Sequence, residues 1–408
     1  MMDGLVLGID LCDEYTQICC ADEDQSWMLP TVICKHKTTD AWYIGEDAYA
    51  HTLFGDGIIV DKLVKLTVKN GMATLGATRY QAAELLKMFL GKVLEFPEQK
   101  FGTMSVSQLV LTIPKLEPAL IEILYLCFEQ LQIPRKRIHI ISRSEAFTYY
   151  VLSQKREIWN NQVGLFHLTA EGLCYYELKV QRGLKKTTVF TECETMEEGF
   201  NLDILDTPSG ARLADKILCS CGERLLQRKL YSSIFLSGKG FEQQAWAEDF
   251  MKFLCSKRKV YVEPVLFARG AAFRAADFLH DKTSYPFIFI CDGRLKTSVS
   301  LNVLHKGQDT VVTVAAAGDN WYECDTILEV IPDEQDTIDF LLTSLDGRSR
   351  RLIRLPLEGF PKRPNRTTKV QIQISFLDDQ TMVVLLTDRG FGELFPASKI
   401  QIRQEVML

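Results

Sequence analysis

The residues that could do chemistry gather near the start of the chain. Residues 5–21 read LVLGIDLCDEYTQICCA: an apolar run ending in Asp10, a polar turn, and a second apolar run. This pattern predicts a buried β-hairpin. In phosphotransfer proteins, an acid at such a strand end directs hydrated Mg²⁺, and small turn residues let backbone N–H groups contact phosphate oxygens. Here the turn is Cys12, Asp13 and Glu14, and its two carboxylates would repel phosphate.

A second hairpin of the same kind follows in the middle of the chain. Residues 163–180 read VGLFHLTAEGLCYYELKV, and the turn holds Thr169, Ala170, Glu171 and Gly172. Two similar hairpins, each followed by strand and helix patterns, indicate an internal duplication, although the two sequences match weakly.

The elements that must position these turns alternate between strands and helices. Residues 107–114, 117–131 and 137–141 predict strand, helix and strand, which favours a parallel or mixed sheet covered by helices. The other predicted elements are strands over 27–35 and 58–70, a turn at Asn70-Gly71, and helices over 78–94 (capped by Thr78), 144–153, 211–229, 248–255 and 265–278, with Gly270 and Ala271 as close-contact residues.

Composition narrows the class of protein. The 408 residues and the net charge of −6 are ordinary for a globular protein and speak against a nucleic-acid binder. The twelve cysteines form no CxxC pair and lack matching histidine spacing, so no metal site is expected. The start of the chain lacks a basic leader, and no apolar run reaches about 18 residues. We therefore expect a cytoplasmic protein that does not bind membranes.

The pattern changes near residues 280–287. Beyond this point short alternating strands run between turn signals to Leu408, and no convincing helix is found, which predicts a β-sandwich. We expect two domains, an α/β domain over residues 1–282 and an all-β domain over residues 286–408.

The order of these pieces resembles the actin and heat-shock-ATPase superfamily, and specifically chaperones of the DnaK type. Residues 109–114 (LVLTIP) are similar to the "ITVP" strand of that family, and the Ser-Gly-Lys-Gly loop before Phe241 resembles its adenosine loop. Residues 355–361 (LPLEGFP), 368–376 (TKVQIQISF) and 388–390 (DRG) resemble its peptide-binding β-sandwich. The resemblance implies an actin-like, duplicated ribonuclease-H-like domain with a reduced adenine-side subdomain, followed by a sandwich without the helical lid.

The resemblance also implies which residues would line a nucleotide cleft, and several depart from the family pattern. They are Asp10, Cys12, Asp13, Glu14, Thr169, Ala170, Glu171, Gly172, Gly238, Lys239 and Gly240. The family has Gly-Thr-Thr at the first turn, Asp-Leu-Gly-Gly-Gly-Thr at the second hairpin, and a glutamate where this chain has Arg143. Because hydrolysis depends on positioning and electrostatic stabilisation, we expect little ATPase activity, no catalytic residues and no required cofactor; ATP or ADP with Mg²⁺ is the alternative.

Individual residues allow a structural interpretation beside each functional one. Asp10 could direct Mg²⁺ or cap the strand end, and Lys239 could neutralise a phosphate or pair with Asp13 or Glu14. Arg143 is expected to form a local ion pair with Glu145. His167, alone in an apolar strand, is expected to be a hydrogen-bonded core residue rather than a base.

In the β-rich half, the resemblance makes Val312, Ile331 and Ile338 candidates for the apolar lining of a peptide groove, although all three could belong to the core. The basic run at residues 348–351 could attract an acidic partner or form a solvated turn.

Three hypotheses follow. The first is a DnaK-related, lidless protein that binds protein or peptide partners and no longer hydrolyses ATP. The second retains ATP binding and slow hydrolysis. The third is an actin-like assembly or scaffold protein, as bacterial relatives of the superfamily often are.

Overall fold

A computed structural model describes residues 4–21, 25–102, 105–182 and 187–408. The chain forms two compact units: unit 1 comprises Met1–Gln181 and Val189–Pro286, and unit 2 comprises Arg182–Thr188 and Phe287–Leu408. The first three residues, on which the expectation about a leader rests, lie outside the described ranges. No helix within those ranges has both the length and the apolar character needed to cross a membrane.

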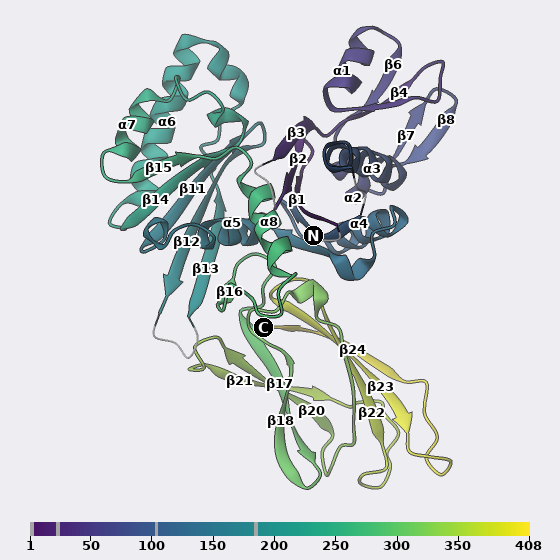
Figure 1. Cartoon of the computed structure of the whole chain (residues 1–408). Coiled ribbons are helices and arrows are strands. Elements are labelled where there is room, and N and C mark those ends of the chain that lie inside the picture. Colours follow the sequence, from purple (N-terminus) through teal and green to yellow (C-terminus); the bar gives the residue numbers. More distant parts are fainter. Residues whose placement is uncertain (1–3, 22–24, 103–104, 183–186) are drawn as a thin grey trace. The chain divides into compact units, whose positions relative to one another are not determined.

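The first hairpin lies at the centre of one sheet of unit 1 (Figure 1). The order of the sheet is β10-β9-β1-β2-β3, with β1 parallel to β9 and antiparallel to β2. Its strands are β1 (Leu5–Leu11), β2 (Tyr15–Cys20), β3 (Ser26–Pro30), β9 (Val106–Ile113) and β10 (Ile138–Ser142). Both β1 and β2 are almost entirely buried, as their continuous apolar runs predict.

The second hairpin is at the centre of a matching sheet. Its strands in unit 1 follow the order β15-β14-β11-β12-β13, with β11 parallel to β14 and antiparallel to β12. They are β11 (Gln162–Thr169), β12 (Gly172–Gln181), β13 (Thr188–Thr195), β14 (Tyr231–Ser237) and β15 (Lys259–Val262). If the five strands of each sheet are numbered in chain order, both sheets have the order 5-4-1-2-3. The shared topology agrees with the duplication that the sequence indicates.

Two helices pack closely at the centre of unit 1, and glycines make this packing possible. A Cβ on Gly270 of α8 would lie 2.0 Å from the carbonyl oxygen of Ala146 on α5, and one on Gly8 of β1 would lie 2.1 Å from that of Ala268 on α8. The larger helices of the unit are α3 (Ala82–Phe101), α4 (Pro118–Gln130), α5 (Arg143–Leu152), α6 (Pro208–Leu226), α7 (Glu248–Cys255) and α8 (Leu266–Asp277).

The segment between β3 and α3 differs most from the prediction. The strand expected over 58–70 is a short strand followed by a helix, because Lys62 adopts a left-handed conformation (φ 52°) between them. The hairpin turn lies at Gly76-Ala77 rather than at Asn70-Gly71, and Thr78 begins a strand, so Gln81 caps α3 instead. The elements are β4 (Ile33–His36), β5 (Trp42–Ile44), α1 (Gly45–Leu53), β6 (Gly57–Val60), α2 (Leu63–Val68), β7 (Met72–Leu75) and β8 (Thr78–Gln81).

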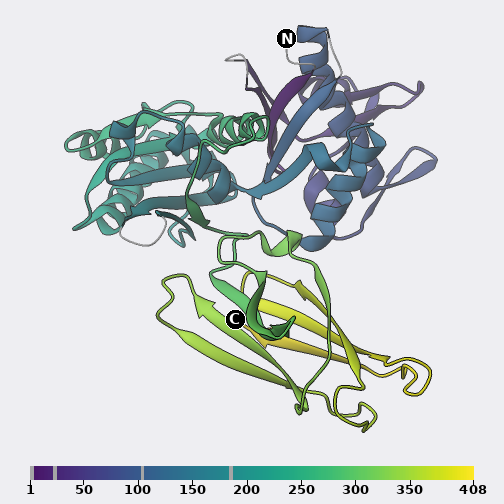
Figure 2. The same ribbon diagram turned by 60° about the horizontal axis from the view of Figure 1, so that its bottom comes forward.

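Unit 2 is built from strands (Figure 2). Two four-stranded sheets have the orders β18-β17-β20-β21 and β19-β22-β23-β24. The strands are β16 (Ile288–Ile290), β17 (Thr297–His305), β18 (Gln308–Ala315), β19 (Thr326–Val330), β20 (Thr337–Ser344), β21 (Arg350–Pro356), β22 (Lys369–Phe376), β23 (Thr381–Gly390) and β24 (Gln401–Met407). The expectation of a β-rich C-terminal half is confirmed. Short 3₁₀ turns across the chain span Arg135–Arg137, Arg156–Ile158, Leu202–Asp206, Lys239–Phe241 and Trp321–Glu323.

Candidate functional site

The carboxylate of Asp10, at the end of the first strand, is paired with an arginine. The Nε and Nη2 groups of Arg143 donate to the two carboxylate oxygens of Asp10 at 3.0 and 2.8 Å. Both side chains are buried, with 0% of Asp10 and 8% of Arg143 exposed. A bidentate pair of this kind uses the acceptor positions that a hydrated metal ion would need. We expected Arg143 to pair with Glu145 on its own helix, but it pairs with Asp10 on β1.

The position of Arg143 explains why it needs an acid. It is the first residue of α5, and Ser142 caps the helix by accepting a hydrogen bond from the backbone of Glu145. A cation at a helix N-terminus is opposed by the helix dipole, whereas a phosphate there would be favoured. Burial alone lowers the pKa of Arg143, but the carboxylate of Asp10 raises it well above its ordinary value. Arg143 therefore stays charged, and Asp10 balances it.

His167 of the second hairpin completes this buried cluster. Its Nε2 lies 3.4 Å from the hydroxyl of Tyr15 and 3.4 Å from Nη1 of Arg143. Burial, together with the charge of Arg143, lowers the pKa of His167 well below its usual value, so the ring is neutral. A neutral imidazole that accepts from arginine fits the expected core role.

The two turn carboxylates of the first hairpin accept hydrogen bonds from backbone N–H groups of the chain itself. Asp13 accepts from the N–H of Val64 at 2.8 Å and of Lys65 at 3.2 Å, and so caps the start of α2. Glu14 accepts from the N–H of Ala170, in the turn of the second hairpin, at 3.3 Å. A phosphate oxygen would seek the same kind of donor. These backbone N–H groups are therefore already satisfied by carboxylates of the chain itself.

A lysine links the two turns as well. Nζ of Lys65 lies 2.5 Å from Glu171 and 4.0 Å from Asp13. We expected Lys239 to make such a pair, but the lysine beside Asp13 is Lys65. The remaining members of the turns are accounted for locally: Cys12 is buried with its thiol directed to the carbonyl of Tyr15, and Thr169 accepts from the N–H of Glu171.

The glycines of the loop that resembles an adenosine site are explained by packing. Gly238 has a φ of 90°, and a Cβ there would lie 2.3 Å from the carbonyl oxygen of Leu168. A Cβ on Gly240 would lie 2.5 Å from the Leu168 side chain. The carbonyl of Gly240 accepts from the indole of Trp246 at 3.0 Å, and Lys239 between the glycines is exposed. The structure brings this loop against the second hairpin without requiring a nucleotide.

Three buried polar atoms near the ends of the central strands have no protein partner within the described residues: Thr112 Oγ1, His167 Nδ1 and Ser237 Oγ. Thr112 lies opposite Asp10 in one sheet, and Ser237 lies opposite His167 in the other, so these are matching positions of the duplicated topology. Buried polar atoms without a protein partner therefore lie at the ends of the central strands of both sheets.

The three residues proposed for a peptide groove have different environments within unit 2. Val312 and Ile331 are 37% and 46% exposed, whereas Ile338 is 5% exposed and belongs to the core. Val312 and Ile331 are therefore accessible to solvent, whereas the side chain of Ile338 on β20 packs in the core.

The contacts define an α/β protein of duplicated topology in which the chain's own side chains join the turns of the two hairpins. Residues 14–292 match the C-terminal region of the family of unknown function DUF5716, and the chain belongs to this family. Residues 294–408 match a second domain of unknown function, DUF8552. No curated protein matches the chain.

Similar solved structures include two of MamK: a non-polymerising mutant bound to AMPPNP, and a double helical filament. Each is 12% identical and covers 67% of this chain and 99% of the MamK chain, with TM-scores of 0.38 and 0.40. At these values the similarity carries no argument about function. None of the comparisons supports a chaperone of the DnaK type.

Proposed function

We propose that this protein is a nucleotide-independent, actin-like scaffold that acts by binding protein partners in the cytoplasm. The observation that carries the proposal is the buried bidentate pair between Asp10 and Arg143. This pair uses both carboxylate oxygens of the one residue that could direct Mg²⁺ at the first hairpin.

The bonds between the turns support the same conclusion. Glu14 bonds to the backbone of Ala170, and Lys65 pairs with Glu171. In the resembled ATPases the phosphates lie between two such turns. To admit a nucleotide, this chain would have to break these bonds and place phosphates beside three carboxylates. We therefore assign no catalytic residue and no cofactor.

Protein binding is favoured by what unit 2 presents to solvent. Val311 on β18 is 61% exposed and Ile327 on β19 is 57% exposed, and both strands lie at the edges of their sheets. Apolar side chains on edge strands suit an extended partner segment. The β-sandwich arrangement that the resemblance implies would present both edges, and its peptide binding stays a proposal.

Calorimetric titration with Mg²⁺-ATP tests the absence of nucleotide binding, and thermal unfolding gives an independent readout. If ATP were present at 100 times its dissociation constant, binding would stabilise the protein by about 2.7 kcal/mol. We expect neither heat of binding nor a shift of the unfolding temperature. Stoichiometric, Mg²⁺-dependent binding with turnover would overturn the proposal.

Sedimentation velocity tests the scaffold role. The distribution of species at rising protein concentration should be the same with and without ATP, because the cleft is closed in both conditions. Assembly that begins only when ATP is added would show that the cleft opens, and would instead support a nucleotide-driven filament.

A further inference from the structure

Two histidines and an aspartate meet in the small β-sheet segment of unit 1. His36 ends β4, His51 lies in the last turn of α1, and Asp56 follows in the loop before β6. Nδ1 of His51 lies 2.9 Å from Oδ1 of Asp56, and Nε2 of His36 lies 3.6 Å from Oδ2. One ligand atom from each residue lies within 4.8 Å of the other two.

We propose that His36, His51 and Asp56 form a binding site for a divalent transition-metal ion, with Zn²⁺ as the preferred ion. Two imidazoles and one carboxylate are a ligand set that zinc accepts, and three protein ligands leave a fourth position open to water or to a partner's side chain.

The separations of the ligand atoms fit this ion. Zinc bonds to nitrogen and oxygen of about 2.0–2.1 Å in a tetrahedral site place neighbouring ligand atoms roughly 3.3 Å apart. The separations of 2.9 and 3.6 Å lie on either side of this value, although each involves a different oxygen of Asp56, and the full set of ligand atoms lies within 4.8 Å. Side-chain rotations would therefore have to bring the three ligand atoms around one ion. The side chains are 17%, 25% and 41% exposed for His36, His51 and Asp56, which leaves access for an ion.

The surrounding residues hold the rings in place. The ring of His51 stacks on Tyr43 with a centroid distance of 3.7 Å, and the His36 ring meets it edge-on at 5.9 Å. A hydrogen bond joins Nδ1 of His51 to Asp56, so the carboxylate already faces the ring with which it would share the ion. On binding, the ion takes the place of the proton on Nδ1 of His51 that faces Asp56, and the neutral ring carries its one proton on Nε2 instead.

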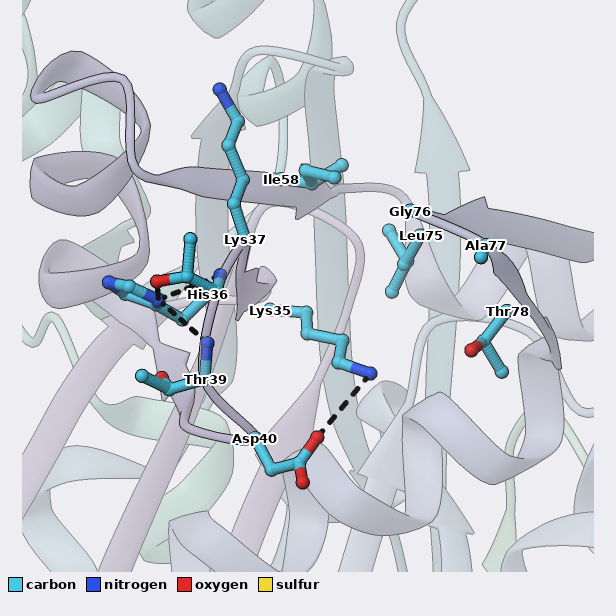
Figure 3. A pocket seen from close by; sticks show the side chains of 11 residues that line it. Lys35, His36, Lys37, Thr39, Asp40, Ile58, Leu75, Gly76, Ala77 and Thr78 are labelled. Atoms are coloured by element: carbon cyan, nitrogen blue, oxygen red, sulfur yellow. Dashed lines mark hydrogen bonds and ion pairs between the residues drawn. The ribbon is translucent and has the colours of Figure 1, made fainter.

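His36 must change its hydrogen bonds for this to occur. Its Nδ1 accepts from the backbone N–H of Thr38 at 3.2 Å. It also accepts from the backbone N–H of Thr39 at 3.2 Å (Figure 3). A neutral ring that binds metal through Nε2 carries its proton on Nδ1. The Thr38 hydroxyl, 3.3 Å away, can accept this proton's hydrogen bond, while the two long N–H contacts are lost. Thr38 is therefore the residue that we expect to orient His36 toward the metal.

Titration with Co²⁺ and competition with Zn²⁺ test the site on the full chain. Co²⁺ should give the visible ligand-field bands of a tetrahedral nitrogen and oxygen site, with one ion per chain and displacement by Zn²⁺. Binding with a sulfur-to-cobalt charge-transfer band in the near ultraviolet would assign the ion to a cysteine and overturn the proposal. Absence of binding would overturn it too.

Variants locate the ion. H51A and the nearly isosteric D56N should each weaken Zn²⁺ binding at least about tenfold, and T38V by about 10- to 100-fold if it orients His36. The matched control is H305A, because His305 is an exposed histidine in unit 2. Far-UV circular dichroism of each variant without metal shows that it is folded. Equal affinity in H51A, D56N and H305A would refute the assignment.

Discussion

The buried pair of Asp10 and Arg143 allows the sharpest test of the interpretation of the cleft. In the variant R143A, Asp10 would keep its place in the core, fully buried and without a partner. Removing one member of a buried ion pair destabilises a protein by about 3–5 kcal/mol, because an uncompensated charge remains. Replacing both members by apolar residues of similar size is often neutral or stabilising. The double variant D10L/R143M should therefore recover most of the stability that R143A loses.

Urea unfolding followed by tryptophan fluorescence measures this difference. The chain has five tryptophans, and Trp321 is the one in unit 2, so a W321F background reports on unit 1 alone. With a slope of about 2–3 kcal/mol per molar urea, the midpoint of R143A should fall by roughly 1 to 2.5 M. A loss of less than about 1 kcal/mol in R143A, or a double variant as unstable as the sum of its single variants, would refute the reasoning.

Three further outcomes are expected. In unit 2, burial alone would raise the pKa of Asp388, but hydrogen bonds from Arg363 and the backbone hold it well below its usual range. The pair's contribution to stability is therefore present above about pH 4 and is lost as pH falls, so R363M should destabilise unit 2 by about 3–5 kcal/mol at pH 7 and less at pH 3, measured through Trp321. Cys174, whose pKa a hydrogen bond with Cys193 lowers to about 6, should be alkylated at pH 6.5 about tenfold faster than in C193A, measured by mass spectrometry. G270A should destabilise unit 1 by about 3 kcal/mol, since its new Cβ would overlap the backbone of α5. G76A meets no atom within 4 Å but has a left-handed φ of 65°, so it should cost only about 1 kcal/mol of backbone strain in thermal unfolding.

Much of the architecture could be predicted from apolar patterns. The strands β1 and β9 are buried on both faces, and their unbroken apolar runs are recognisable without any partner. The region of β6 and α2 could not be predicted in this way. The helix has six residues, and its cap is the carboxylate of Asp13, which lies about fifty residues earlier in the chain. The residue pattern of the helix itself cannot indicate a capping residue so far away in the sequence.

The structure brings the two predicted turns together, but their contacts could not be predicted from the sequence. The sequence shows that acids replace the small residues at the first turn; it does not show that Glu14 reaches Ala170 or that Arg143 reaches Asp10. The sequence gives no indication that Lys65 contacts the turns, because this residue belongs to a segment that we predicted to be a strand. The histidines of the proposed metal site are separated by 15 residues and come together only when β4 and α1 fold around Tyr43.

The bond between Glu14 and Ala170 has a consequence for how such a scaffold would be recycled. In filament proteins that hydrolyse a bound nucleotide, older subunits differ from new ones. The hydrolysed nucleotide marks the time since assembly and weakens the contacts between subunits. If the chain is the scaffold that we propose, the contact of Glu14 with Ala170 stands where a nucleotide would lie, so every copy would be equivalent whatever its history. Release of a bound partner would then have to come from outside, through competition by another protein or through degradation.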